Sequence, residues 1–316
     1  MKKAFEKLNL RDYGVLIGFL ALCIAISIAT PSFLGKQNIL NLLRQSSIIG
    51  IISAGMTFVI ISGNFDISVG AVAALAGAIT MKFATGGTNL FVSMILGIAI
   101  CAVIGLINGI VVAKINVPSL IATMAMVTIV RGLLLMLTGG YPITENIPIL
   151  DYIGNGYLFN IPIPVVIFFI VVFASFIVLN KTKFGRYVYS VGGNQEASKL
   201  NGINVDSHKI KVFIINAILA GIAGIVLTGR LGTATAIAGE GYDMDAIASV
   251  VIGGTSVAGG SGSVLKTVIG VLLMSVINNS FNLLGIDVYF QYIFKGLIIL
   301  AAVGFDSYSK KKLASR

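Results

Sequence analysis

Two glycine-rich, charge-poor segments interrupt long apolar runs in this chain, and they constrain its fold more than any other feature. The first covers residues 62–70 (SGNFDISVG) and the second covers residues 253–263 (GGTSVAGGSGS). Unpaired backbone N–H and C=O groups are costly against lipid, so irregular backbone does not face the hydrocarbon of a bilayer. We therefore expect both breaks to lie at a membrane surface or beside a path enclosed by protein. One break in each half of the chain is typical of a transporter.

The apolar runs themselves indicate a polytopic membrane protein. Mean hydropathy is +0.99 and 11% of the residues are charged, whereas soluble domains carry roughly 25%. We expect an all-α fold of about ten transmembrane helices in two inverted-topology halves, with residues 1–316 forming a single transmembrane domain. The expected spans lie near residues 14–30, 45–62, 68–84, 90–113, 118–138, 162–180, 211–231, 243–258, 263–283 and 288–305.

The charge distribution orients these spans. Net charge is +10, but the basic residues gather at the ends of the expected spans and form no basic–aromatic patch that would suit nucleic acid. With both termini on one side, sixteen of the 22 Lys and Arg residues fall on that side and four on the other, while Arg131 and Lys295 fall inside spans. The positive-inside rule therefore predicts cytoplasmic termini in a plasma membrane.

A weak internal echo relates the two halves. Residues 130–135 (VRGLLL) resemble residues 294–299 (FKGLII), and residues 106–109 (LING) resemble residues 276–279 (VINN). Five expected spans separate the members of each pair, which gives the two copies opposite orientations. The spacing inside each copy differs, so coincidence remains the alternative.

The longest polar segment, residues 181–210, is expected on the cytoplasmic side. Within it, residues 194–200 (NQEASKL) predict a short helix. Asn194 suits its N-cap, and Gly202 suits the positive-φ position that ends a helix. Two interpretations are open. The segment is either a solvated loop or a docking helix that passes the movement of a cytoplasmic partner to the adjoining spans.

No catalytic or nucleotide-binding motif is readable. Residues 260–267 (GSGSVLKT) fail as a phosphate-binding loop, because Leu265 stands where a glycine must precede Lys-Thr. Cys23 and Cys101 lie in apolar runs and His208 is alone, so neither a disulfide nor a metal site is expected. We expect a chain that is not an enzyme and holds no cofactor. Energy for transport must then come from a partner chain or an ion gradient.

Acidic residues in mid-membrane usually accompany ion coupling. Asp66 is the one acid inside a break, where the alternative is that it caps the following helix. Glu240, Asp243 and Asp245 precede the eighth expected span on the outer side. None of these acids is clearly at the centre of the bilayer, which weakens the ion-coupled hypothesis.

Several motifs together resemble the permease subunits of bacterial ABC importers for simple sugars, the ribose-type permeases. Residues 63–70 resemble the family's G-x-x-D-L-S-V-G signature, and residues 241–262 contain a match to its second signature (GYDMDAIA, VIGGTS and GGSG). Matches to the family's cytoplasmic loop and to ribose permeases lie at residues 185–187, 192–194, 202–203, 278–279, 282–285 and 289–291. The resemblance covers nearly the whole chain. Departures at Asn64, Ile67 and Glu240 bear on the identity of the sugar more than on family membership.

The resemblance implies a function and a set of partners. It implies a permease homodimer in a bacterial plasma membrane, cytoplasmic ABC ATPase modules that bind ATP and magnesium, and an extracytoplasmic sugar-binding protein. The permease would pass a monosaccharide, ribose above all, from that protein into the cytoplasm. A proton-coupled secondary transporter of a small neutral solute is the alternative, and a membrane scaffold or receptor is the third hypothesis.

The expected site residues fall into three groups, and none is expected to be catalytic. Residues expected to line the translocation path are Asn64, Asp66, Ser68, Thr255, Ser256 and Ser261. Residues expected to dock the ATPase are Arg186, Asn194, Glu196, Lys199 and Gly202. Residues expected to dock the binding protein are Arg44, Arg230 and Glu240.

Overall fold

The computed structural model describes residues 10–314 and is built almost entirely of helices, as the sequence predicts. The helices are α2 (Leu10–Ala29), the 3-10 helix η1 (Pro31–Leu34), α3 (Lys36–Ile61), α4 (Val69–Thr85), α5 (Leu90–Ala113), α6 (Ser119–Thr138), α7 (Pro148–Asn155), α8 (Ile163–Lys181), α9 (Lys183–Gly193), α10 (Gln195–Leu200), α11 (Val205–Leu231), α12 (Tyr242–Ile252), α13 (Val264–Leu283) and α14 (Val288–Ala314). Strands of two residues pair antiparallel, β1 (Ile143–Thr144) with β4 (Thr233–Ala234) and β2 (Tyr157–Leu158) with β3 (Ile161–Pro162). The charges expected at Lys2, Lys3, Lys7 and Arg316 lie outside the described residues.

Long apolar helices occupy most of the expected spans. Among the described residues, six helices are long and apolar enough to cross a membrane, namely α3, α5, α6, α8, α11 and α13. Shorter apolar helices cover residues 15–29, 69–85 and 288–304. Apolar helices are therefore present at nine of the ten predicted positions, and six of them are long enough to cross a membrane.

The prediction of a full helix at the eighth position, residues 243–258, is wrong. α12 has 11 residues, which gives a length of about 17 Å at 1.5 Å per residue, too short for a hydrocarbon core of about 30 Å. The helix ends at Gly253, and Gly254 has a φ of +87°, a conformation that non-glycine residues rarely adopt. A largely irregular segment, residues 232–241, leads from α11 into this short helix.

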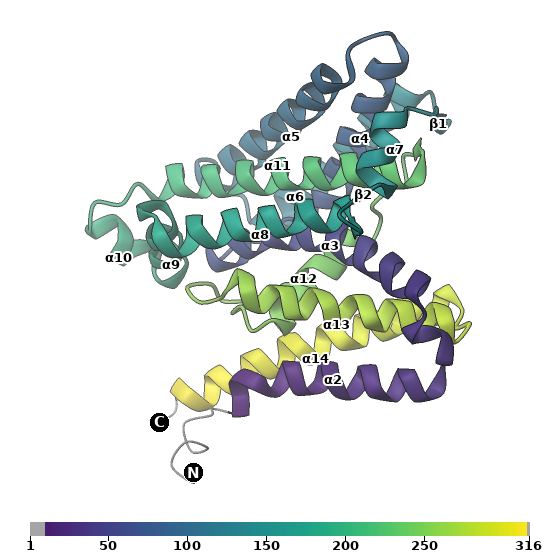
Figure 1. The fold of residues 1–316 in the computed structure, drawn as a ribbon. Helices are drawn as coiled ribbons and strands as arrows, with labels where there is room; N and C mark the ends of the chain where they lie inside the picture. Colours follow the sequence, from purple (N-terminus) through teal and green to yellow (C-terminus); the bar gives the residue numbers. More distant parts are fainter. Residues whose placement is uncertain (1–9, 315–316) are drawn as a thin grey trace.

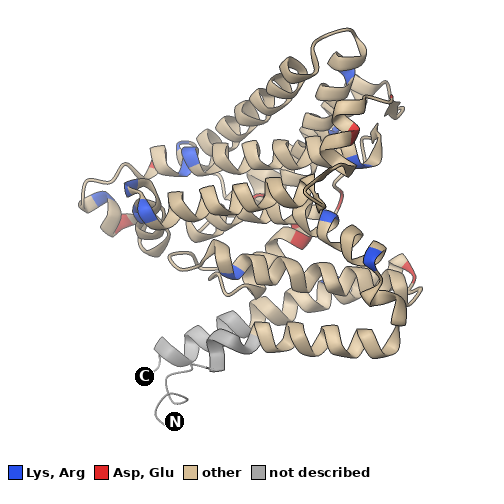
Figure 2. Cartoon of the chain, viewed as in Figure 1, with Lys and Arg blue, Asp and Glu red and all other residues tan. Residues whose placement is uncertain are grey.

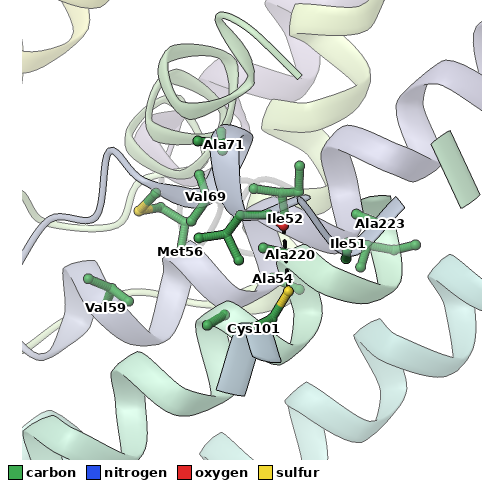
Figure 3. Packing of buried hydrophobic residues seen from close by; sticks show 14 of the residues in the cluster. Ile51, Ile52, Ala54, Met56, Val59, Val69, Ala71, Cys101, Ala220 and Ala223 are labelled. Atoms are coloured by element: carbon green, nitrogen blue, oxygen red, sulfur yellow. Dashed lines mark hydrogen bonds between the residues drawn. The ribbon is translucent and has the colours of Figure 1, made fainter. Parts of the chain in front are cut away.

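α11 lies at the centre of the packing and contacts α3, α4 and α5 extensively (Figure 1). Glycines permit this close approach, because a Cβ on Gly105 of α5 would lie 2.6 Å from the Phe213 carbonyl oxygen of α11. Cys101 packs among buried aliphatic side chains with its Sγ 3.5 Å from the Val72 carbonyl oxygen (Figure 3). It therefore behaves as a small buried apolar residue, as predicted.

The two ends of the helical body are formed by different elements. α9 and α10 lie at one end together with the start of α2 and the end of α14, whereas α7 and the paired strands lie at the opposite end (Figure 1). Figure 2 shows several Lys and Arg residues around α9 and α10, while the helices between the two ends carry few charges. This separation is the one that a membrane-embedded helical body requires.

Candidate translocation site

The first break, between α3 and α4, is held by a buried polar network around Asp66. Asp66 Oδ1 accepts hydrogen bonds from the Ser68 backbone N–H at 2.9 Å and from the Ser68 hydroxyl at 2.5 Å. Its Oδ2 accepts one from Asn216 Nδ2 of α11 at 2.9 Å, and Asn108 of α5 donates to Ser68 Oγ at 3.1 Å. All four side chains are buried. Asp66 thus binds the backbone directly before α4, in keeping with the capping interpretation, and joins that helix to α5 and α11.

Three glycine-bearing segments meet backbone to backbone beside this break. The Gly260 N–H donates to the Ile61 carbonyl at 2.8 Å, which ties the second break to the end of α3. A Cβ on Gly192 of α9 would collide with the same carbonyl, and a Cβ on Gly259 would lie 2.9 Å from the Gly63 backbone. We call this contact between residues 61–63, 192–193 and 259–260 the glycine junction. It joins both breaks to the polar segment that the sequence marks as a candidate docking site.

The short helix α10 forms where the sequence predicts it. The Asn194 side chain accepts a hydrogen bond from the Ala197 N–H at 2.9 Å, and Gly202 has a φ of +76°, so the predicted N-cap and helix end are confirmed. The Ser198 hydroxyl lies 2.9 Å from that of Ser190, which fastens α10 to α9. The side chains of the remaining expected docking residues, Arg186, Glu196 and Lys199, are exposed.

Tyr189 links α9 to the second break through its side chain. Its hydroxyl donates a hydrogen bond to the Gly262 carbonyl at 3.0 Å. Burial raises the pKa of the Tyr189 phenol, so the group stays protonated and able to donate at neutral pH. α9 is therefore attached to the second break both by this bond and by the glycine junction.

A second buried network surrounds Asp245 in the first turn of α12. Its carboxylate oxygens lie 3.0 and 3.1 Å from Lys295 Nζ of α14, and Oδ2 accepts a hydrogen bond from Asn278 Nδ2 of α13 at 3.3 Å. Sequence reasoning singled out Asp245 and Lys295 separately but missed their pairing, because 50 residues separate them and no local pattern connects them. The ion pair ties α12, α13 and α14 together.

Residues at corresponding positions of the two similar sequence segments make similar contacts. Arg131 of α6 donates to two carbonyl groups of residues 232–241, the segment that leads into α12. Lys295 likewise binds the first turn of α12. Asn108 and Asn278 bind the polar side chains at the starts of α4 and α12 respectively. These parallel contacts favour an internal repeat over coincidence.

The residues expected to line the path are mostly enclosed within the protomer. Asn64, Asp66, Ser68, Thr255 and Ser256 are buried, and Ser261 is exposed. They lie in the two breaks, which come together at the glycine junction. Their burial gives the first five a role in holding the shape of the breaks in this conformation.

The outer residues expected to dock the binding protein also differ in exposure. Arg44 is buried, donates to the Asn155 carbonyl at 3.2 Å and lies 4.9 Å from the centroid of the Tyr157 ring. Arg230 is partly buried at the end of α11, whereas the Glu240 side chain is exposed. Arg44 therefore supports the end of the molecule that carries α7 and the paired strands.

This arrangement suits the movement of helices. Asp66 and Asp245 are both engaged by donors, and within residues 10–314 no group of three His, Cys, Asp or Glu side chains could hold a metal ion. The glycine junction and the tethered α10 instead connect an exposed polar helix with both breaks.

Comparison with known proteins decides the family. Residues 38–303 match the family model described as branched-chain amino acid transport system, permease component. The chain belongs to this permease family. The permease is 43% identical to the ribose import permease protein RbsC of Haemophilus influenzae, over 93% of this chain and 94% of that protein. It is 42% identical to the ribose import permease protein RbsC of Bacillus subtilis, over 94% of this chain and 93% of that protein.

A further relative is the L-arabinose transport system permease protein AraH of Escherichia coli, 36% identical over 95% of this chain and 92% of that protein. No solved structure matches the permease. The relatives confirm the resemblance to sugar permeases of ABC importers and a role as a multi-pass transport subunit that is not an enzyme. They do not favour the secondary transporter or the scaffold.

Proposed function

We propose that this permease imports a monosaccharide, ribose in particular, by passing it from an extracytoplasmic binding protein into a bacterial cytoplasm. The observation that carries the proposal is the 43% identity with a ribose import permease over 93% of the chain. The xylose and L-arabinose permeases among the relatives are 34% and 36% identical. Ribose permeases therefore match this chain better than permeases for these two other pentoses.

The proposed orientation puts α9, α10, the start of α2 and the end of α14 in the cytoplasm. The excess of Lys and Arg on this side supports it. An ABC ATPase, which would bind the ATP and magnesium, would then dock on α9 and α10. Arg186, Glu196 and Lys199 offer exposed charges for this contact, while Asn194 and Gly202 shape the helix that presents them.

The binding protein would dock at the opposite end, on α7 and the paired strands. The exposed side chains there include Phe159, 92% exposed in the turn between β2 and β3, and Tyr141, 79% exposed. Arg44 and Arg230 would act beneath this surface, since Arg44 holds residues 155–157 against α3. A second copy of the permease would complete the translocation path.

The glycine junction suggests how ATP-driven movement would reach the path. Displacement of α9 by the ATPase would press directly on the end of α3 and on the second break, because these backbones touch without intervening side chains. The network around Asp66 would carry the displacement on to α4, α5 and α11. Contacts between rigid elements of this kind transmit small movements over a distance.

Uptake of labelled ribose by vesicles tests the proposal. The permease is reconstituted with its ATPase and supplied with its binding protein outside and ATP inside. We expect uptake that requires both ATP and the binding protein and that a protonophore leaves nearly unchanged. Uptake driven by a proton gradient in the absence of ATP would favour the secondary transporter instead.

A further inference from the structure

A groove lined by both charged and apolar residues lies between α6 and α14, next to the segment that leads into α12. Two adjoining cavities of about 480 and 320 Å³ form it, and both are lined by Glu240, Gly241, Met244 and Tyr292. Arg131 and Asp243 line the larger cavity, while Gln291 and Lys295 line the smaller one. We call these eight residues the α6–α14 groove. Its volume falls within the range of about 300–1,000 Å³ that is typical of small-molecule sites.

The groove lies well inside the membrane-spanning body. Gly239, directly before it in the chain, packs against Gly70 in the first turn of α4. That turn lies beside the middle of α11, because Ala73 of α4 contacts Gly224 and Asp66 binds Asn216. Arg131 and Lys295 each lie about 10 Å along the helix from the outer ends of α6 and α14.

Charged groups at this depth do not face lipid, because ionised side chains are costly inside the hydrocarbon region. The groove must therefore face water or a protein surface. A second permease copy would enclose it, and the enclosed space would be a polar passage in the middle of the membrane.

The chemistry of the groove suits a neutral polyol. Arg131 already donates to the Ala236 and Ala238 carbonyls and Lys295 already pairs with Asp245, so the positive charges are engaged. Among the described residues, no side chain donates a hydrogen bond to the carboxylates of Glu240 or Asp243. These carboxylates can accept hydrogen bonds from sugar hydroxyls.

Tyr292 completes this set of groups. Its side chain is 60% exposed and borders both cavities. An aromatic ring with a phenolic hydroxyl packs against the C–H face of a sugar and still offers a hydrogen bond at its edge.

We propose that the α6–α14 groove binds the monosaccharide during its passage through the permease. The Glu240 and Asp243 carboxylates accept hydrogen bonds from its hydroxyls, and the Tyr292 ring packs against its C–H face. Glu240, expected from the sequence to dock the binding protein, takes this role instead. This inference rests on the proposed import of a monosaccharide and adds a site within the permease itself. With two carboxylates and one aromatic ring as its contacts, the groove holds the sugar weakly and releases it readily.

A labelling experiment on the complete transporter tests the groove. Met244→Cys is introduced into a permease that carries Cys23→Ser and Cys101→Ala, and its alkylation by a small water-soluble thiol reagent is followed during ATP turnover. We expect D-ribose to slow the alkylation at least about twofold. Leu200→Cys on α10, where the side chain is 90% exposed, is the control and is expected to react at the same rate with and without ribose.

The isosteric variants Glu240→Gln and Asp243→Asn provide the second measurement. Replacing both carboxylates removes the charge that strengthens their hydrogen bonds to the sugar. Ribose should then no longer protect the thiol introduced by Met244→Cys, and the KM for uptake should rise about tenfold. Alkylation that ribose does not slow, in a complex that imports ribose, would refute the groove. So would an unchanged KM for ribose uptake in the double variant. Ribose uptake by the parent complex tests the proposed function separately.

Discussion

Asp66 accepts three hydrogen bonds within the membrane-spanning body. Two come from the nearby Ser68 and one from Asn216, which lies 150 residues along the chain. Asn216 Oδ1, on the same amide, has no hydrogen-bond partner within the described residues. The Asn216 amide can therefore rotate by half a turn and offer an acceptor in place of a donor. The network is thus able to tolerate an amide at position 66 but not the loss of the polar group.

Because the network accepts an amide at position 66 but needs a polar group there, two substitutions of Asp66 should have different effects. Asp66→Asn should keep most ribose uptake, because Asn caps helices about as well as Asp and Asn216 can turn to pair with it. Asp66→Leu should lower the free energy of unfolding by about 1–3 kcal/mol, the usual cost of leaving buried donors unpaired. Thermal unfolding and uptake measure the two effects.

The swap Asp66→Asn with Asn216→Asp is the matched control. Asn216→Asp alone places two carboxylates side by side and should destabilise the permease, while the swap restores one carboxylate and one amide and should recover much of the stability. Complete loss of uptake in Asp66→Asn with normal folding, together with protonophore sensitivity of the parent, would instead indicate that Asp66 carries a proton.

Among the elements, α9 has the clearest mechanical role, and its two final glycines allow a matched test. A Cβ on Gly192 would collide with the Ile61 carbonyl, whereas a Cβ on Gly193 would lie 4.0 Å from its nearest neighbour, Gly260 Cα. Gly192→Ala should therefore force α9 away from α3 at a cost of about 1–3 kcal/mol, typical of overpacking. Gly193→Ala should be harmless.

The measurement compares sugar transport with ATP hydrolysis in both variants. We expect Gly192→Ala to co-purify with the ATPase but to import less ribose for each ATP hydrolysed, because α10 and its exposed charges are unchanged. Equal coupling in the Gly192→Ala and Gly193→Ala variants would show that the glycine junction does not carry the movement.

The positions of helices could be predicted from the sequence wherever the length of an apolar run was enough to locate them. The hydrophobic runs locate α3, α5, α6 and α11, and local capping signals locate α10 through Asn194 and Gly202. The run at residues 243–258 misleads, because it is apolar enough for a span but contains the glycines that end α12. The partners of Asp66 and Asp245 could not be predicted, since they depend on contacts between distant segments.

For the molecule as a whole, the uneven distribution of Lys and Arg predicts the orientation of the permease in the membrane. Thiol labelling from each side measures it. In the permease lacking Cys23 and Cys101, Ser261→Cys should react with a membrane-impermeant thiol reagent added on the cytoplasmic side, because this residue is exposed beside the glycine junction. Tyr141→Cys, exposed at the opposite end, should react only from outside. The reverse labelling of the two sites would overturn the proposed topology.

The glycine junction consists of main-chain atoms, which are the same whatever the amino-acid sequence around them. Movement that passes through such backbone contacts does not depend on the chemistry of the transported solute, since no side chain at the junction could distinguish one solute from another. Substitutions that retune selectivity elsewhere in the protein would leave this coupling intact. Coupling to ATP hydrolysis and selectivity for the solute therefore depend on different groups of atoms. One can be changed by protein engineering while the other is kept.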